Sequence, residues 1–423
     1  MKLLAYPPIR SLAIRAIVLK ERVTAGAVFD PLDESFRRNP YPSYRRLQTR
    51  DPVHWSGLTR GWVLTRYADV MDVLRDPTFS ANRSQADVVQ ELRGQQPQGP
   101  FFQFLDQSLL SLDPPDHARL RSLVNKAFTR RVVDSLRPRV TEIVNELLDR
   151  VQNAGRMDLI GDFAYPLPVI VIAEMLGVPA EDRMRFKAWS DDLGAALDPL
   201  AAPEIVRRAD QAVLALRAYF HPLFEARRRE PREDLLSGLV AAEEAGERMN
   251  TEELYATCIL LLGAGNETTT NLIGNGMLAL LRHPDQFDLL RDDPALITTA
   301  VEEMLRYDAP VQLTSRVATE DLEIGGKPVR AGQMVTVALG AANRDPLQFA
   351  NPSAFDITRP DSHQAAFGHG IHFCLGAPLA RLEAQAALPI LLERMPRMAL
   401  VEGEPAWRKT MVLRGLRRLP VSF

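Results

Sequence analysis

The sequence predicts a mainly α-helical fold with small β-sheets, organised as one large domain. Three observations lead to this prediction. Apolar residues recur at helical spacing through most of the chain, as they do across residues 134–152. Strand-like runs are short and gather in two places. No change in composition, low-complexity segment or internal repeat marks a domain boundary along the 423 residues.

The composition is that of an ordinary globular protein and argues against several functional classes. Apolar residues make up 46 % of the chain, and 51 Lys and Arg stand against 54 Asp and Glu, a net charge of −3. This near-neutral balance argues against a nucleic-acid-binding protein. Only Cys258 and Cys374 are cysteines, which excludes a four-cysteine metal or iron–sulfur site. A disulfide scaffold is equally unexpected, so we expect a reducing, cytoplasmic location.

The first residues predict a docked or frayed N-terminal arm. Residues 1–20 are fairly apolar, but Arg10, Arg15 and Lys20 interrupt every run. A membrane span needs about 20 consecutive apolar residues, and a signal peptide needs an unbroken apolar centre of about 7–15. We therefore expect neither, while an amphipathic segment lying on a surface stays open.

Two hairpin regions supply the expected strands. The first pairs residues 53–55 with residues 62–65 across a glycine-containing turn, and the second pairs residues 322–324 with residues 335–337. Residues 94–100 (Gly-Gln-Gln-Pro-Gln-Gly-Pro) hold turn formers without periodicity, which predicts a loop.

The longest predicted helix runs from Thr251 to about His283. Asn250 and Glu253 fit a capping box at its start. At 1.5 Å per residue such a helix would span about 50 Å. Its middle, residues 259–262, is apolar on all sides, so we expect this helix to be buried.

Glycines and an acid interrupt this buried helix at residues 263–268 (Gly-Ala-Gly-Asn-Glu-Thr). The run fails as a dinucleotide fingerprint, because the third glycine is missing and a helix precedes it instead of a strand. Helix–helix packing and the close approach of a flat ligand explain the glycines equally well. In the second case the helix would widen at Gly265 and free a carbonyl group.

A second predicted helix, residues 295–307, carries Glu303 and Arg306 three positions apart. At this spacing the two side chains share a face of the helix. By itself such a pair is typical of a weak surface ion pair.

The segment most indicative of chemistry is residues 367–376 (Phe-Gly-His-Gly-Ile-His-Phe-Cys-Leu-Gly), which an apolar helix follows from Ala377 to Leu388. A thiol at a helix N-terminus meets the positive end of the helix dipole and free N–H groups, which favour the thiolate. The glycines let backbone amides reach the sulfur and let a flat group lie over the loop. A lone buried cysteine is ordinarily a small hydrophobe, but ten residues in this order favour a site centred on Cys374.

The run F-G-x-G-x-H-x-C-x-G in residues 367–376 resembles the haem-ligand loop of the cytochromes P450, the haem-thiolate monooxygenases. The resemblance covers residues 29–423 and leaves residues 1–28 as an arm outside it. It implies a single-domain cytochrome P450 fold, with haem b between the long central helix and the helix that follows the cysteine. Three other segments fall in family order, namely the propionate-binding His117-x-x-x-Arg121, the oxygen-activating run 264–269 and the E-x-x-R pair Glu303-x-x-Arg306.

The resemblance implies a role for each matching residue. Cys374 would be the axial thiolate, Thr268 would hold dioxygen and a water molecule, and Glu267 would link that site to outside protons. The residues implied to contact haem or neutralise its propionates are His117, Arg121, Ala264, Gly265, Thr269, Arg316, Phe367, Gly368, His372 and Gly376. A structural network beneath the haem loop is implied for Glu303, Arg306 and Arg359.

The implied function is an O₂-dependent monooxygenase that hydroxylates or epoxidises an apolar small molecule, such as a terpenoid, steroid, fatty acid or macrolide. A non-catalytic haem sensor or carrier is an alternative, against which the proton-delivery pair Glu267 and Thr268 speaks. A cysteine hydrolase is another, for which Cys374 lacks a separate base and orienting group. The apolar pocket is expected to include Phe101, Phe102, Phe104, Val311 and Leu313.

Electrons for such a reaction would have to come from another protein. The chain contains no G-x-G-x-x-G unit and too few cysteines for an iron–sulfur cluster. We therefore expect NAD(P)H electrons to arrive through a separate ferredoxin or flavodoxin with its reductase. Lys126, Arg130 and Arg131 would form part of its landing patch, although a solvated helix end also explains them. We expect a monomer without a nucleic-acid partner.

Overall fold

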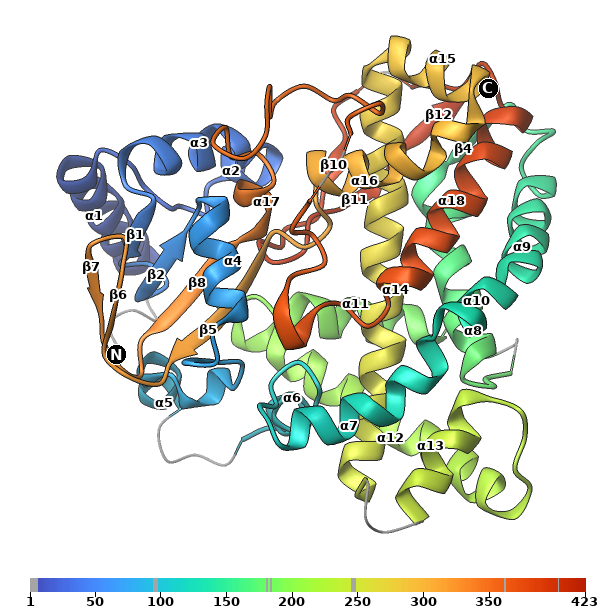
Figure 1. Cartoon of the computed structure of the whole chain (residues 1–423), viewed down its shortest axis with the longest axis horizontal. Helices are drawn as coiled ribbons and strands as arrows, with labels where there is room; N and C mark the ends of the chain where they lie inside the picture. The colour runs from blue at the N-terminus through green and yellow to red at the C-terminus, as the bar shows by residue number, and fades with distance from the viewer. Residues whose placement is uncertain are drawn as a thin grey trace.

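The computed structural model describes residues 7–93, 98–179, 182, 185–244, 249–360, 363–401 and 403–423. Figure 1 shows a helical body around one long central helix, α14, and beside it a smaller region in which a sheet lies among α1 to α4. The helices are α1 (Pro7–Ala25), α2 (Glu34–Arg38), α3 (Tyr41–Arg50), α4 (Tyr67–Arg75), α5 (Asp87–Arg93), α6 (Pro100–Asp106), α7 (Asp116–Val124), α8 (Arg130–Ser135), α9 (Arg137–Asp149), α10 (Pro166–Met175), α11 (Arg185–Ala196), α12 (Pro203–Arg229), α13 (Leu235–Glu244), α14 (Thr251–Arg282), α15 (Pro284–Asp292), α16 (Ile297–Tyr307), α17 (Leu339–Ala342) and α18 (Ala377–Arg394).

The strands form one five-stranded sheet and three small ones. The large sheet has the order β1-β2-β8-β5-β3, in which β1 and β2 form the first predicted hairpin, with Val53 opposite Leu64. The strands are β1 (Val53–Ser56), β2 (Gly61–Leu64), β3 (Phe79–Ser80), β4 (Arg156–Asp158), β5 (Leu313–Ala318), β6 (Leu322–Ile324), β7 (Lys327–Val329), β8 (Met334–Ala338), β9 (Ala399–Leu400), β10 (Ala406–Trp407), β11 (Leu416–Arg418) and β12 (Pro420–Ser422).

The second predicted hairpin is wrong in its pairing. Strand β6 pairs with β7, and β8 instead pairs parallel to β2 and antiparallel to β5 in the large sheet. Gly325 and Gly326, with φ values of +55° and +77°, form the two-residue connection between β6 and β7. Such a loop matches the twist of a tight hairpin, whereas four of the five residues of β8 are buried, as expected of a central strand.

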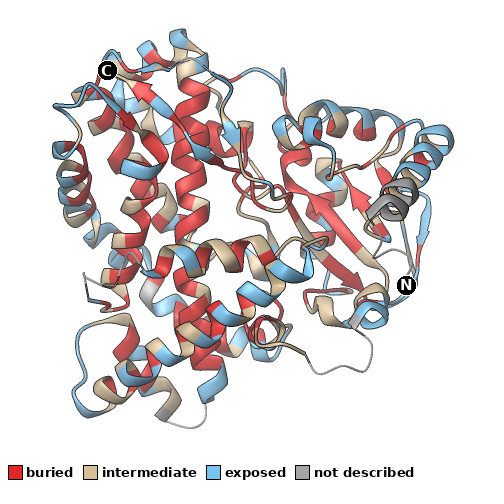
Figure 2. Cartoon of the chain, turned by 180° about the vertical axis from the view of Figure 1, so that it is seen from behind, coloured by how far each residue is buried: buried red, intermediate tan, exposed pale blue. Residues whose placement is uncertain are grey.

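Helix α14 is the predicted long helix. Asn250 accepts a hydrogen bond from the Glu253 N–H, and the Glu253 carboxylate accepts one from the Asn250 N–H, which completes the capping box. The helix ends at Arg282, before Pro284. Figure 2 shows it buried along nearly its whole length. It therefore provides a rigid, buried wall beside the region that its middle faces.

The other helix predictions hold with shifted boundaries. The expected helix at 134–152 is divided into α8 and α9, because Pro138 begins a new helix in the first turn of α9. The expected helix at 295–307 is α16, with a short 3₁₀ turn (Pro294–Leu296) before it. Of the predicted loop 94–100, residues 94–97 lie outside the described residues, and α6 begins at Pro100.

Of the docked or frayed N-terminal arm that the sequence left open, the described part is docked on the sheet region. Helix α1 places Glu21 against the first hairpin, where its carboxylate accepts a hydrogen bond from the Gly57 N–H at 2.7 Å and lies 3.2 Å from His54 Nε2. Across the described part of the chain, no helix combines the length and apolarity that crossing a membrane requires.

Candidate active site

The cysteine loop has a fixed shape that its glycines make possible. Gly368 and Gly370 both have φ of +70°, a conformation that residues with a side chain rarely adopt. A Cβ atom on Gly370 would also lie 2.4 Å from the carbonyl oxygen of Leu74. The Cys374 N–H donates to the Phe367 carbonyl at 2.9 Å, which closes the loop and delivers the thiol to the start of α18.

The Cys374 sulfur lies among hydrogen-bond donors. Burial raises the pKa of its thiol, while the N–H groups of Gly376 and Ala377 and the positive charge of Arg121 act in the opposite direction. Gly376 and Gly368 have no heavy atom within 4 Å of where a Cβ would stand, so space opens beside the loop. The loop therefore presents one sulfur, backed by amide donors, toward an open region.

Four predicted residues converge from three parts of the chain into one basic cluster. His117 and Arg121 come from α7, Arg316 from β5 and His372 from the cysteine loop. The two imidazole rings lie 4.2 Å apart between centroids, and Arg121 Nη2 donates to the Phe373 carbonyl at 2.8 Å. The Nε2 atoms of both histidines are buried and find no hydrogen-bond partner among the described residues.

Arg83 is a fifth member of this cluster that sequence reasoning missed. Its guanidinium donates to the Leu110 carbonyl at 2.9 Å and to the Thr314 hydroxyl at 3.1 Å. Burial and the nearby charge of Arg316 lower the pKa of Arg83 to about 9. Arg83 belongs to no recognisable motif, and its only sequence signal is a charged residue in a short turn that Asn82 caps.

The basic cluster holds more positive charge than the described protein groups neutralise. Burial lowers the pKa of Arg316 to about 10, and burial together with Arg316 lowers that of His372 to about 3. The carboxylate of Asp113 acts against the lowering of the pKa of Arg83, His117 and Arg316, but in the described part of the chain no carboxylate forms an ion pair with Arg316. Uncompensated buried cations of this kind favour an anionic ligand.

In the middle of α14 the small side chain of Ala264 borders open space. Ala264 is exposed although its neighbours along the helix are buried or half-buried, so this turn borders open space. Gly265 does not share that face, because a Cβ there would meet Ile172 of α10 at 3.5 Å. The expected widening of the helix at Gly265 is wrong: the helix stays regular, and the Thr268 and Thr269 hydroxyls donate to the carbonyls of Ala264 and Gly265 at 2.9 and 3.3 Å.

Glu267 is buried beside this turn in an unusual electrostatic setting. Its Oε1 lies 3.5 Å from Arg408 Nη1, and its Oε2 has no hydrogen-bond partner in the protein. Arg408 also pairs with Asp191 of α11 at 2.9 Å. Burial raises the pKa of Glu267 to about 7, with Arg408 opposing and Asp191 and Asp198 adding to the rise. Sequence spacing could not reveal Arg408, which lies 141 positions away. It follows β10 in the hairpin of β10 and β11 (residues 406–418), which we call the C-terminal hairpin.

Glu303, Arg306 and Arg359 form the predicted network, fully inside the protein. Arg306 bonds both carboxylate oxygens of Glu303 at 2.7 Å, and Arg359 Nε donates to Glu303 Oε2 at 3.1 Å. The reading as a surface pair is therefore wrong, because Glu303 and Arg306 are both 0 % exposed. The remaining donors of Arg306 bind the carbonyls of Asn343, Pro352 and Ala354.

The predicted substrate-pocket residues do not line one common surface. Phe101 is 0 % exposed and Phe104 8 %, and both lie in the main hydrophobic core. Leu313 is 3 % exposed in a separate cluster on the sheet side. Phe101 therefore acts through packing and offers no surface to a ligand. Contact of a substrate with the half-buried Phe102 and Val311 stays a prediction.

The donor set fits haem. Haem is flat and carries two propionates, and the structure pairs a thiol at a helix N-terminus with a cluster of arginines and two imidazoles whose Nε2 atoms have no hydrogen-bond partner in the described part of the chain. The exposed Ala264 leaves room for a planar face. Cys374 would hold the metal, and His117, Arg121, Arg316, His372 and Arg83 would surround the propionates.

Comparisons with known proteins point to one family. The family model described as "Cytochrome P450" matches residues 54–396. The Vitamin D(3) 25-hydroxylase of Pseudonocardia autotrophica is 45 % identical over 400 residues, which cover 93 % of this chain and 96 % of that protein. The cytochrome P450 monooxygenase PikC of Streptomyces venezuelae is 43 % identical over 402 residues, 93 % of each chain. The crystal structure of P450BioI in complex with hexadec-9Z-enoic acid ligated acyl carrier protein matches with a TM-score of 0.87 and 41 % identity, over 92 % of this chain and all of that one.

Proposed function

The chain belongs to the cytochrome P450 family, and from this membership we propose that Cys374 is the thiolate ligand of its haem and that Thr268 and Glu267 serve proton delivery. The enzyme is a haem-thiolate monooxygenase. When bound, haem held by a thiolate would activate O₂, so that with two electrons and two protons one oxygen atom would enter the substrate and the other would leave as water. The observation that carries the assignment is the thiol at the start of α18 together with the uncompensated basic cluster.

The protein side of the reaction rests on positions that the fold fixes. His117 on α7 and Arg316 on β5 would hold the propionates, and Cys374 would hold the metal. The Thr268 hydroxyl donates its proton to the Ala264 carbonyl, so its oxygen remains free to accept a hydrogen bond from water. Glu267, with a pKa of about 7, can both hold and release a proton at Oε2 near neutral pH.

We propose an elongated apolar molecule as the substrate. The relatives support this class: one is named for hydroxylating vitamin D₃, and another was solved with a long-chain fatty acid carried on an acyl carrier protein. Phe102 and Val311 are the predicted contact residues that keep partly exposed surface. A panel of apolar ligands, scored by the shift of the haem absorbance, tests the class, because a substrate that displaces water from iron changes the spin state.

The thiolate assignment is tested with reduced protein under carbon monoxide. Wild type should show the absorbance band of a thiolate-ligated haem, and Cys374→His should lose both that band and oxygenation. If the variant keeps both, the ligand lies elsewhere. Cys258→Ser is the matched control, since Cys258 is buried in the core, where burial raises the pKa of its thiol.

The role of Thr268 has its own test, which also separates an enzyme from a haem sensor or carrier. Thr268→Ala should keep haem and substrate binding but divert reducing equivalents from product to hydrogen peroxide. If Thr268 only bonds its own helix, the yield of product per electron pair will equal that of wild type. Wild-type protein that binds haem but forms no oxygenated product with any partner or ligand would favour the sensor.

A further inference from the structure

Helix α14 carries a stripe of buried polar side chains that continues beyond the active site. Glu267, Asn271 and Asn275 follow one another at four-residue spacing and so lie on one face of the helix. They are only 5, 1 and 2 % exposed. Among the residues that the structure describes, Glu267 Oε2, both amide atoms of Asn271 and Asn275 Oδ1 have no hydrogen-bond partner. We call these three residues the polar seam.

The C-terminal hairpin lies along the seam. Arg408 approaches the carboxylate at its inner end, 3.5 Å away. Gly415 lies against Asn271 so closely that a Cβ atom there would overlap the side-chain amide. The amide of Asn275 donates to the Arg414 carbonyl at 3.0 Å. The hairpin thus covers the whole seam, yet it satisfies only a few of the seam's polar atoms.

The spacing of the seam suits water molecules. Residues four apart on a helix are separated by about 6 Å along its axis. Side chains at this spacing can bond directly, but Glu267 Oε2 and the two amide atoms of Asn271 do not bond each other. One water between each pair would bridge that distance with two ordinary hydrogen bonds. Buried polar atoms that lack a protein partner are ordinarily bound to water. The seam therefore has the polar groups and the spacing of a short buried water chain.

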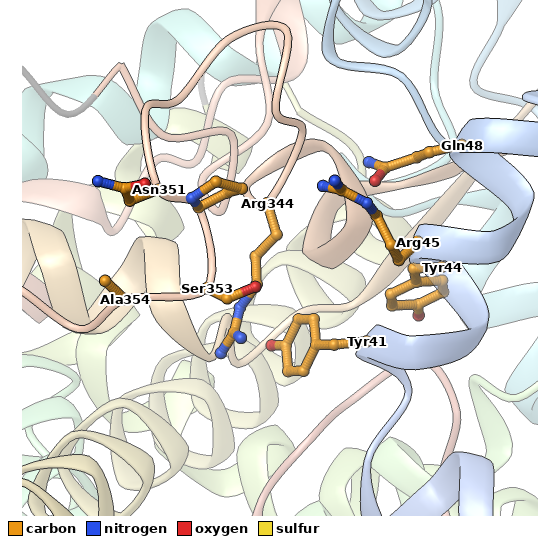
Figure 3. A pocket seen from close by; sticks show the side chains of 9 residues that line it. Tyr41, Tyr44, Arg45, Gln48, Arg344, Asn351, Ser353 and Ala354 are labelled. Carbon is orange, nitrogen blue, oxygen red and sulfur yellow. The ribbon is translucent and has the colours of Figure 1, made fainter.

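The outer end of the seam leads to a surface cavity. Asn275 Nδ2 lies 3.3 Å from the carbonyl oxygen of Asp308, and the Asp308 carboxylate accepts a hydrogen bond from the Tyr41 hydroxyl at 2.7 Å. Tyr41 lines a cavity of about 460 Å³ between α3 and the segment 344–354, which is open at the exposed Arg45. Figure 3 shows the Tyr41 ring beside the Arg344 guanidinium in this cavity.

Two more orphaned polar atoms mark the region between the cavity and the seam. Gln312 Oε1 and the Tyr44 hydroxyl are buried without a hydrogen-bond partner in the protein, and both residues adjoin Tyr41. Together with the seam they form a series of polar groups from the cavity to Glu267. The remaining orphaned histidine nitrogens belong to the basic cluster and are explained by haem.

We propose that the polar seam is a buried, water-filled proton path, which carries protons from the cavity at Tyr41 past Asn275 and Asn271 to the carboxylate of Glu267. The path deepens the proposed function, because it supplies the proton that Glu267 delivers. Each transfer moves one proton along hydrogen-bonded water and leaves no net change in the seam. Asn271 and Asn275 are positioning residues, since amides hold water in place but do not ionise at neutral pH.

The test measures how fast the Glu267 carboxyl exchanges its proton for deuterium, by infrared spectroscopy of the haem-containing resting enzyme at pH 6. Glu267→Gln identifies the carboxyl band. Asn271→Leu fills the middle of the seam with an apolar side chain and should slow exchange about tenfold, the change expected for a barrier raised by about 1.4 kcal/mol. Asn271→Ala removes the amide that holds the water but leaves room for it, so it should slow exchange less than Asn271→Leu does, a difference that a merely structural role of the amide would not produce.

Thr270→Val is the matched control. Thr270 is equally buried on the same helix, but its hydroxyl already bonds the Asn266 carbonyl, so exchange should not change. Tyr41→Phe tests the cavity end and should also slow exchange, and it provides the test if Asn271→Leu does not fold. Exchange at the wild-type rate in Asn271→Leu or in Tyr41→Phe would overturn the path. Because the measurement needs neither substrate nor turnover, its failure would leave the monooxygenase function intact.

Discussion

Glu267 shows how one residue's environment sets its chemistry. Burial raises its pKa from 4.5 to about 7, against the opposing charge of Arg408, while Asp191 and Asp198 add to the rise. Between pH 4.5 and 7 the folded protein therefore keeps a proton on this carboxyl that the unfolded chain has already released. The free energy of unfolding consequently falls as pH rises through this range.

From this we predict that Glu267→Gln raises the thermal midpoint at pH 8 and leaves it nearly unchanged at pH 4.5. A rise of 2.5 pKa units corresponds to at most about 3 kcal/mol. Calorimetry of haem-loaded protein across this pH range checks the prediction. Glu252→Gln, in the first turn of the same helix, is the control: hydrogen bonding to Arg217 lowers the pKa of Glu252, so no gain is expected. An equal gain at both pH values would contradict the titration of Glu267.

Arg316 gives a second prediction at the residue scale. If it neutralises a propionate, Arg316→Ala leaves a buried carboxylate unpaired, at a cost of several kcal/mol, and Arg121→Ala acts in the same way to a smaller degree because Arg121 is more exposed. Haem retention, measured by competition with an apo-globin, should fall in both variants. Arg229→Ala, an exposed arginine that bonds its own helix, is the control. Equal retention in all three would place the propionates elsewhere.

At the scale of the element, the network below the cysteine loop joins α16 to the segment 350–359. Arg306 uses all five of its N–H donors, two on Glu303 and three on backbone carbonyls. Asp356 N and Arg359 bind the same Glu303 carboxylate. A lysine has three donors on a flexible stem and cannot reproduce this planar set.

We therefore predict that Arg306→Lys lowers the free energy of unfolding by about 3–5 kcal/mol, as expected when a buried pair is broken. Chemical denaturation followed by circular dichroism measures the loss. Arg291→Lys is the control, because Arg291 also contacts two carboxylates, Asp288 and Asp292, but at the surface, where exchange of the cation costs less than about 1 kcal/mol. Equal losses of unfolding free energy in Arg306→Lys and Arg291→Lys would show that the network does not hold α16 and the segment 350–359 together.

Helix α1 contacts a buried histidine whose pKa is raised by its carboxylate neighbours. His54 contacts Asp51 at 2.9 Å and Glu21 at 3.2 Å. Burial alone would lower the pKa of His54, but the hydrogen bonds to Glu21 and Asp51 outweigh it, and the pKa is raised above 6.5. This stabilisation is present in full below the unfolded pKa and is lost as pH rises through the folded one.

Amide hydrogen exchange of α1, corrected for the intrinsic pH dependence of exchange, should therefore show more opening at pH 9 than at pH 6. In His54→Gln the difference between the two pH values should disappear. His221→Gln removes an imidazole that bonds Tyr255 in another part of the fold. In that variant the difference in opening between the two pH values should remain. A pH effect that persists in His54→Gln would assign the titration to another group.

At the scale of the whole molecule, we propose that the enzyme depends on a separate electron carrier. The exposed Lys126, Arg130 and Arg131 follow α7, whose Arg121 bonds the backbone of the cysteine loop. This places positive charge near the proposed thiolate, where an acidic ferredoxin or flavodoxin would transfer electrons. Charge steering would make association fall with ionic strength.

We predict product formation from NAD(P)H and substrate only when a carrier and its reductase are added, and slower first-electron transfer in Arg130→Glu. Stopped-flow reduction under carbon monoxide measures this rate at low and high salt. Arg291→Glu on α15 should reduce at the wild-type rate. Turnover without added partners would overturn the dependence, whereas an unchanged rate in Arg130→Glu would remove only this patch.

The sequence by itself determined the class of fold and the family, and it singled out Cys374, Thr268 and Glu303 as candidates. Each lies in a local motif whose chemistry depends on neighbours within a few positions: a glycine loop before a helix, polar residues inside a buried helix, or a pair one turn apart. The capping box of α14 and the hairpin of β1 and β2 were predictable for the same reason, because caps and tight turns form within four residues.

Only the tertiary structure decided which distant residues meet. It paired β8 with β2 and β5, turned Gly265 toward α10 rather than toward the open face, and brought Arg83 into the basic cluster. It also set Arg408 beside Glu267 and laid the hairpin along Asn271 and Asn275. These contacts depend on packing between elements separated by tens to hundreds of residues, and burial, which sets the pKa of Glu267, exists only once those elements have closed around it.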